Sequence, residues 1–300
     1  MATLVGTVRS AQITGKARGG ENSGKSVVFL CLLWLSLLIG LVTLITLIVT
    51  TLMDGIGRID STLVTAFPSS RPEEAGARPA VLGSIWVIGV AAVMTVPLGV
   101  AAAVHLEEFG DKKNWFNRSL EVNVQNLSAV PSIIYGMLAL GILALVGVQN
   151  KNIVIGGALA MTLLILPVVI IATREALRAV PTEMRQASLA LGASPVQTVW
   201  RTTLPSSIPG IATGTILALS RALGEAAPLL LLGALVFISF DPNGLMSGFT
   251  TMPIQIYNWT SAPQAEFHEL AAAASILLLI ILMAMNALAI FIRNRYQRRW

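Results

Sequence analysis

Two ionisable residues lie inside a long apolar stretch of this sequence, residues 207–240. Arg221 and Glu225 are four residues apart, so a helix would place them on one face, where they can form an ion pair. A charge at the centre of a membrane span costs about 2.5–3.5 kcal/mol on insertion scales, and should therefore face a protein interior. A guanidinium also matches the oxygens of a phosphate group. Either the pair only locks helices together, or Arg221 meets a passing anion and Glu225 holds Arg221 between passages.

A polar segment, residues 174–205, precedes this stretch and is too highly charged to lie in hydrocarbon. Its charged residues are Arg174, Glu175, Arg178, Glu183, Arg185 and Arg201. Arg174 and Arg178 directly follow an apolar run, and two roles are open for them. They receive an anion that has crossed, or they anchor the chain as part of the positive charge that faces the cytoplasm.

Turn and capping residues divide the same segment into two short helices. Thr182 suits a helix N-cap, and Gly192 suits the left-handed position just past a helix end. Ser194 followed by Pro195 is a second cap, and the second helix should run to about Thr203. The two short helices together form either a docking surface for another protein or a simple connector that lies at the membrane surface.

The composition identifies the class of protein that carries these residues. Of 300 residues, 55% are hydrophobic and only 12% are charged, whereas about a quarter of the residues of soluble domains are charged. The mean hydropathy is +0.76. We therefore expect an all-α integral membrane protein, because a helix satisfies its own backbone hydrogen bonds inside a bilayer.

Six apolar runs predict six transmembrane helices, since each approaches or exceeds the roughly 20 residues needed to cross. The runs are 27–53, 80–104, 127–148, 153–172, 207–240 and 270–292. The fifth run is too long for one straight crossing, and Pro228 is the expected bend or break. Small residues in the fourth run should allow neighbouring helices to approach closely: Gly156, Gly157, Ala158 and Ala160.

The distribution of basic residues predicts the orientation. One side of the six-span arrangement carries 15 Lys or Arg and the other carries 4, so both termini and the 173–206 loop should be cytoplasmic. The expected organisation is a flexible cytoplasmic tail (1–26), a first transmembrane helix (27–53), a core with five transmembrane helices (80–292) and a basic cytoplasmic tail (293–300). The basic residues flank apolar runs, which favours contact with membrane lipid and not with nucleic acid.

Residues for a metal or cofactor site are scarce. A single cysteine, Cys31, and two histidines argue against a disulfide and a Cys or His metal site. Gly19, Gly24, Lys25 and Ser26 match the phosphate-loop pattern, but that motif needs a preceding strand and a following helix in an α/β sheet. We therefore expect no cofactor and no metal in this chain.

The polar segment also resembles the EAA loop of binding-protein-dependent ABC transporter permeases. The family pattern is E-A-A, three residues, G, nine residues, I, one residue, L-P. Its counterparts here are Gln186, Ala187, Ser188, Gly192, Thr202, Leu204 and Pro205 at the same spacing. Gln186, Ser188 and Thr202 depart from the pattern, which weakens a charge-based docking role for Gln186. The resemblance implies a type I ABC importer permease, whose EAA coupling helix docks on an ATPase.

Four further stretches resemble the A-type permeases of phosphate-specific uptake systems. They are Val-Pro-Ser-Ile-Ile-Tyr-Gly at 130–136, Ala-Leu-Gly-Ala-Ser at 190–194, Ser-Arg-Ala-Leu-Gly-Glu-Ala-Ala-Pro-Leu-Leu at 220–230 and Pro-Ile-Gln-Ile-Tyr-Asn-Trp at 253–259. The resemblance covers about residues 27–295. It implies a phosphate importer in the bacterial inner membrane.

The resemblance also implies partners. They are a C-type permease subunit that forms a heterodimer with this chain, a dimer of ATPase subunits and a periplasmic phosphate-binding protein. ATP hydrolysis would belong to the ATPase, so this chain is not expected to be an enzyme. The alternatives are a permease for another oxyanion, sulfate or molybdate, and a membrane-embedded enzyme. An enzyme of that kind needs clustered acids or a nucleophile with a base at membrane depth, and only Arg221 and Glu225 are ionisable there.

Overall fold

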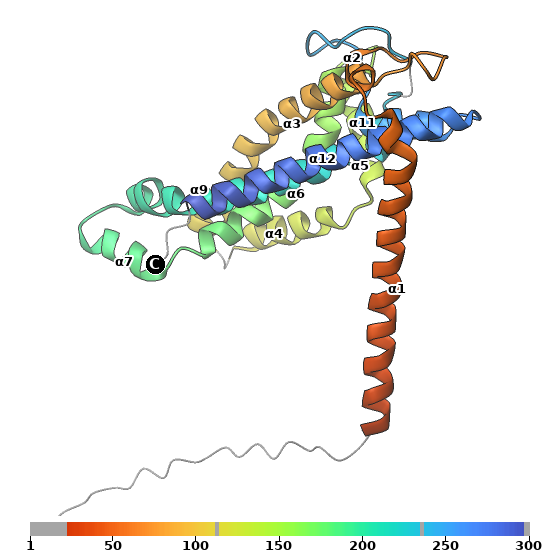
Figure 1. Ribbon diagram of the computed structural model, residues 1–300. Helices are drawn as coiled ribbons and strands as arrows, with labels where there is room; N and C mark the ends of the chain where they lie inside the picture. The colour runs from red at the N-terminus through yellow and green to blue at the C-terminus, as the bar shows by residue number, and fades with distance from the viewer. Residues whose placement is uncertain (1–22, 112–113, 235–236, 297–300) are drawn as a thin grey trace, which may run out of the picture. The chain divides into compact units, whose positions relative to one another are not determined.

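The computed structural model describes residues 23–111, 114–234 and 237–296 and contains only helices, turns and loops within these ranges (Figure 1). The chain divides into two compact units, residues 1–50 and 51–300. In the first unit, helix α1 (Ser23–Gly55) is apolar on all sides, and its described side chains up to residue 50 are exposed, as suits a helix surrounded by lipid. Gly24, Lys25 and Ser26 belong to this helix and form no loop, whereas Gly19 lies outside the described residues.

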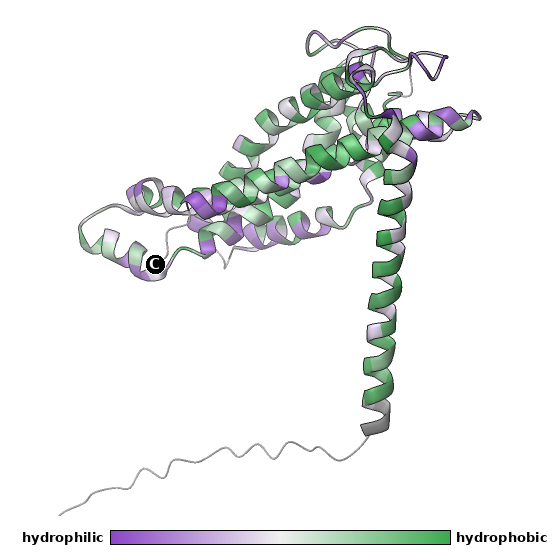
Figure 2. Cartoon of the chain, viewed as in Figure 1, coloured by the Kyte–Doolittle hydropathy of each residue, from purple (hydrophilic) through white to green (hydrophobic). Residues whose placement is uncertain are grey.

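Three long helices of the second unit confirm predicted spans. They are α3 (Arg78–Val104), α6 (Val154–Arg178) and α12 (Ala265–Tyr296). Together with α1, they give four helices long and apolar enough to cross a membrane within the described residues. Green dominates α1 and the middle of α12 in Figure 2, whereas polar residues gather on α4 (Trp115–Ser128) and α7 (Thr182–Ala190).

The predicted third span, 127–148, is wrong as a single helix. The chain instead forms α4 (Trp115–Ser128) and α5 (Ser132–Leu145), which are bent by 112° at the break between them. Pro131 cannot donate a backbone hydrogen bond, and the Tyr135 hydroxyl donates to the Leu127 carbonyl oxygen at 2.5 Å across the bend. If α4 and α5 count as one broken span, length and composition give five candidate spans within the described residues. The six-span count stays a prediction.

The predicted fifth span also divides, but earlier than expected. Helix α9 (Leu204–Leu223) ends at Gly224, and a short helix, α10 (Ala227–Leu231), follows. Pro228 therefore lies in the first turn of α10, a position that tolerates its missing N–H, and not at the break itself. The break places Glu225 in the connection and Arg221 in the last turn of α9.

The second unit also contains shorter helices. Among them are the 3₁₀ turn η1 (Ile56–Arg58), α2 (Ser61–Thr65) and α11 (Met252–Thr260). Asp60 caps α2 by accepting a hydrogen bond from the Leu63 N–H, and the Thr62 hydroxyl, followed by that N–H, lowers the pKa of the Asp60 carboxyl. Arg78, at the start of α3, pairs with Asp241 at 2.5 Å.

Helix α6 lies at the centre of the packing and is buried along most of its length. Gly156, Gly157, Ala158 and Ala160 are all buried, as predicted for residues that let helices approach. Gly157 lies under the ring of Phe249.

A second small-residue contact escaped the sequence analysis. Gly210 and Gly214 of α9 lie directly over the methyl groups of Ala176 and Ala172 of α6. This contact is a small-x-x-x-small pairing of two helices. It fixes α9, and therefore Arg221, against α6.

Glycine also joins α5 to α10. A Cβ atom at Gly136 would lie within 2.4 Å of the Pro228 carbonyl oxygen, whereas a Cβ at Gly141, on the same helix, would meet no atom within 4 Å. The contact joins residues 130–136 to residues 220–230, two of the stretches that resemble A-type phosphate permeases.

This difference gives a prediction for stability. Gly136→Val should destabilise the protein by about 1–3 kcal/mol or prevent folding, because the backbone of α10 must move to make room. Gly141→Val introduces the same side chain into the same helix and should leave stability within about 0.5 kcal/mol. Thermal unfolding of the detergent-solubilised variants measures both effects. Equal melting temperatures would contradict the α5–α10 packing.

Candidate functional site

The segment between α6 and α9, here called the 182–203 loop, contains two short helices, α7 (Thr182–Ala190) and α8 (Pro195–Thr198). Gly192 has φ = +83°, so the predicted left-handed turn is confirmed. Ser194 is also confirmed as a cap: its hydroxyl accepts from the Gln197 N–H, and the Gln197 side chain accepts from the Ser194 N–H. Thr182 is not a cap, because Pro181 holds that position and Thr182 is the first helical residue.

The second helix of the loop does not stop near Thr203 as predicted. A π-helical turn, η3 (Val199–Thr203), joins α8 to α9 without interruption. The Leu204 N–H bonds to the Val199 carbonyl oxygen five residues back, and Pro205 then occupies the first turn of α9. The wider turn accommodates a proline whose missing N–H would otherwise interrupt an α-helix.

The EAA-like residues divide between the surface and the interior of the loop. Gln186 and Ala187 are exposed, whereas the Ser188 hydroxyl lies 3.0 Å from the Thr198 hydroxyl and joins α7 to α8. Leu204 is half-buried and Pro205 is exposed. On its inner side, the loop is therefore held together by the contact between the two hydroxyl groups. Its outer surface is exposed.

Sequence reasoning missed the apolar part of that outer surface. Leu191 is 89% exposed at the tip of the loop, and Leu189 and Val196 are also exposed. Three large apolar side chains close to Gly192 in the chain could have been noticed in the sequence. They give the loop a surface suited to contact with another protein.

Arg174 and Arg178 lie in the last part of α6 and face carboxylates. Arg174 is buried, with Nε 3.2 Å from Glu107 and Nη2 2.7 Å from Glu121. Arg178 places its Nε 2.9 Å from Glu107 and its Nη1 3.3 Å from Glu175. These pairs hold both arginines in place, and contact with a passing anion stays a prediction.

A polar cavity of about 340 Å³ opens beside these ion pairs. Its lining includes Leu106, Gly110, Asn117, Arg118, Glu121, Arg174 and Arg178. Both α6 arginines line this cavity, but only the Arg178 side chain is substantially exposed, at 42% against 7% for Arg174.

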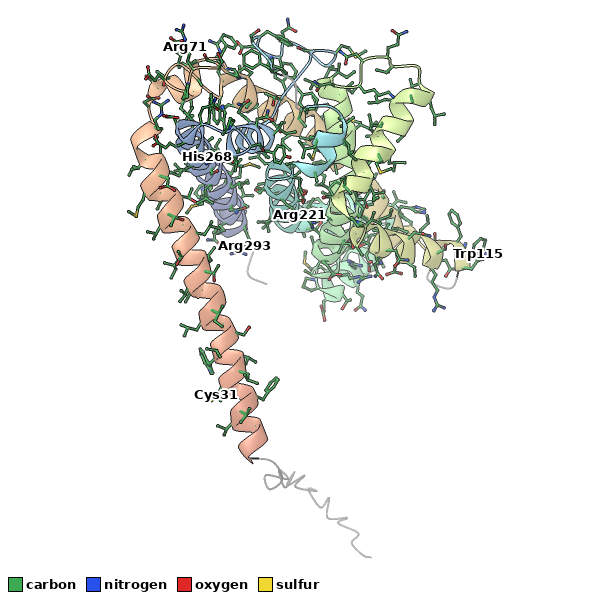
Figure 3. All side chains as sticks on the ribbon, turned by 90° about the vertical axis from the view of Figure 1, so that its right-hand side faces the viewer. Cys31, Arg71, Trp115, Arg221, His268 and Arg293 are labelled. Atoms are coloured by element: carbon green, nitrogen blue, oxygen red, sulfur yellow. The ribbon has the colours of Figure 1, made fainter. Side chains whose placement is uncertain are left out.

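Arg221 and Glu225 form the predicted ion pair, with Nε and Oε1 3.7 Å apart. Figure 3 labels Arg221 among the side chains. The separation is long for a charged hydrogen bond, and the Arg221 side chain is 57% exposed. Glu225 also lines a small cavity that is shared with Ser84 and Thr251. The Arg221 guanidinium is thus open to solvent, and contact with an anion stays a prediction.

Metal-binding groups are not gathered into a site. In the described ranges, no cluster of three or more His, Cys, Asp or Glu side chains has the arrangement of a metal site. Cys31 is exposed on α1.

Comparison with known sequences identifies related proteins. Residues 95–300 match the family model "Binding-protein-dependent transport system inner membrane component". The probable ABC transporter permease protein YqgI of Bacillus subtilis is 32% identical over 253 residues, which cover 79% of this chain and 84% of the relative. The phosphate transport system permease protein PstA of Yersinia pestis is 31% identical over 275 residues (91% and 92%). PstA 1 of Mycobacterium tuberculosis strain H37Rv is 35% identical over 225 residues (75% and 71%).

Solved structures share the fold. A bacterial alginate ABC transporter, in complex with an alginate pentasaccharide-bound periplasmic protein, gives a TM-score of 0.62 at 15% identity and covers 93% of this chain and 99% of its own. An inward-facing methionine ABC transporter, MetNI, gives 0.59 at 18% identity (73% and 95%).

Proposed function

The chain belongs to the binding-protein-dependent transport system inner membrane components, and we propose that it is the A-type permease subunit of a phosphate importer. As a member of this family it is a multi-pass inner membrane protein, the permease component of an ABC importer and not its ATPase. The finer assignment concerns the substrate, the orientation and the partner subunits.

The observation that carries the phosphate proposal is the half-exposed Arg221 at the end of α9. Its carboxylate partner is 3.7 Å away, so the guanidinium keeps N–H donors available for an oxyanion. When no anion is bound, Glu225 neutralises the charge of Arg221 and keeps its side chain from pairing with other groups. Relatives named as phosphate transport permeases, 30–38% identical over most of this chain, support the choice of phosphate.

The proposed cycle uses this chain as half of a pathway. A periplasmic binding protein delivers phosphate to the outer mouth, and a C-type permease subunit completes the enclosure. Both termini and the 182–203 loop face the cytoplasm, where the loop docks on an ATPase dimer through Leu191 and its exposed neighbours. Closure of the ATPases on ATP displaces the loop and switches access from one side to the other.

The main rival is a permease for sulfate or molybdate, since a guanidinium binds any of these oxyanions. The first experiment therefore measures ATP hydrolysis and uptake in vesicles containing this chain, its permease partner and the ATPase. Phosphate on its binding protein should stimulate both activities, and sulfate should not. Equal stimulation by sulfate, or hydrolysis indifferent to substrate, would remove the phosphate assignment and leave the family membership intact.

Substitution of the central arginine tests the pathway. Arg221→Gln should leave the complex assembled and lower phosphate uptake by about ten- to a hundredfold, the loss expected for a charge-assisted hydrogen bond. Arg221→Lys keeps the charge and should retain intermediate activity. Arg71→Gln alters an exposed arginine that is paired with Glu74, and should behave as wild type. Unimpaired uptake by Arg221→Gln would reduce the arginine to a structural role.

Docking of the 182–203 loop is tested at Gly192. Gly192→Asp introduces backbone strain of about 1–2 kcal/mol and a charge at the docking surface, and should abolish assembly with the ATPase or uncouple it. Gly147 has nearly the same backbone conformation, φ = +79°, and both glycines have open space around them. Gly147→Asp thus reproduces the strain away from the loop and should retain ATPase binding. Normal phosphate uptake by Gly192→Asp would overturn the docking assignment.

A further inference from the structure

Two consecutive carboxylates after α3 bind different parts of the protein. Glu107 and Glu108 lie in a π-helical turn, η2 (His105–Phe109), and their side chains are only 6% and 8% exposed. Glu107 lies 3.2 and 2.9 Å from the Nε atoms of Arg174 and Arg178 in α6. Glu108 lies 2.9 Å from Nη2 of Arg185, in α7. A single turn therefore connects α6 to the 182–203 loop.

Arg185 has a second fixed partner near the end of α6. Its Nη2 donates a hydrogen bond of 2.7 Å to the Leu177 carbonyl oxygen. The guanidinium is thus held by a buried carboxylate and by a backbone carbonyl at the same time. Arg185 is therefore placed to carry a displacement of α7 to η2 and α6.

An apolar cluster lies beneath these charges. Val104 at the end of α3, Leu177 in α6 and Val199 in η3 are buried against one another. Close-packed side chains of this kind transmit displacement because they do not compress. The cluster joins the end of α3 and α6 to η3, whereas the ion pairs join η2 to α6 and α7.

The ion pairs continue to a further helix. Glu121 of α4 lies 2.7 Å from Nη2 of Arg174, which also pairs with Glu107. Helix α4 leads through the 112° bend into α5, which packs against α10. A movement of η2 can therefore reach the region beside Arg221.

We propose that the Arg185–Glu108 ion pair is the joint through which the 182–203 loop drives the membrane helices; this inference rests on the proposed function. Displacement of the loop pulls Glu108 through Arg185. Because Glu107 shares the π-helical turn, the movement passes to α6 and, through Glu121, to α4. Arg185 and Glu108 are positioning residues that touch no substrate.

The test measures substrate taken up per ATP hydrolysed in the complete transporter in vesicles, together with the amount of ATPase that co-purifies. Glu108→Gln and Arg185→Ala should each lower uptake per ATP by at least about fivefold, with ATPase binding unchanged and hydrolysis within about twofold of wild type. Arg185→Lys keeps the charge and should recover most of the lost coupling. The double swap Glu108→Arg with Arg185→Glu should recover part of it.

The Arg78–Asp241 pair supplies the matched control, because it also joins distant segments but lies outside this network. Arg78→Ala should leave uptake per ATP unchanged. Unchanged uptake per ATP in Glu108→Gln would overturn the joint. If the single variants fail to assemble, a double swap that restores assembly without coupling would also overturn it.

The proposed role of the Arg185–Glu108 pair and the phosphate assignment can be disproved independently of each other. If the wild-type complex responds to sulfate-loaded and not to phosphate-loaded binding protein, the phosphate assignment is wrong. Uptake per ATP is then measured with sulfate, and the same comparison of Glu108→Gln with Arg78→Ala decides the joint.

Discussion

Close packing of helices on α6 is the constraint on which the rest of this structure depends. Helices in a bilayer gain little from hydrophobic burial, because the lipid is as apolar as the side chains, and association therefore relies on van der Waals contact. Alanines at 172 and 176 face glycines at 214 and 210, so that α9 can approach closely. The position of Arg221 follows from this contact, since Arg221 is in the last turn of α9.

Arginines at the two ends of this packing have different surroundings. Arg174 is buried between Glu107 and Glu121, and Arg178 meets Glu107 and Glu175, so their charges are balanced by fixed carboxylates. Arg221 has one carboxylate at longer range and a largely exposed side chain. A guanidinium that is not saturated can exchange partners, whereas buried paired ions resist separation. The proposed role of Arg221 in handling the anion follows this difference, whereas the ion pairs of the α6 arginines connect α6 to η2 and α4.

Local patterns in the sequence were sufficient for features that depend on near neighbours. The apolar runs at 27–53, 80–104, 153–172 and 270–292 correspond to helices because composition alone decides whether a segment prefers lipid. Gly192 and Ser194 were predicted correctly because a left-handed turn and a capping box need only the adjacent residues. The ion pair of Arg221 with Glu225 followed from helical spacing.

Features that join distant segments were decided by the tertiary structure. The bend between α4 and α5 and the early end of α9 position Gly136 against Pro228, a contact between residues far apart in the chain. The helix that continues through Pro205 needs a π-helical turn, and no residue pattern in the sequence predicts that turn. Glu108 and Arg185 were both visible in the sequence, but only the packing of α3, α6 and α7 brings them within 2.9 Å. The sequence by itself determined the membrane class, the family and the turn chemistry of the loop, because these depend on composition and short spacing. The three-dimensional fold decided where helices break and which charges meet, because both depend on contacts made across the bundle.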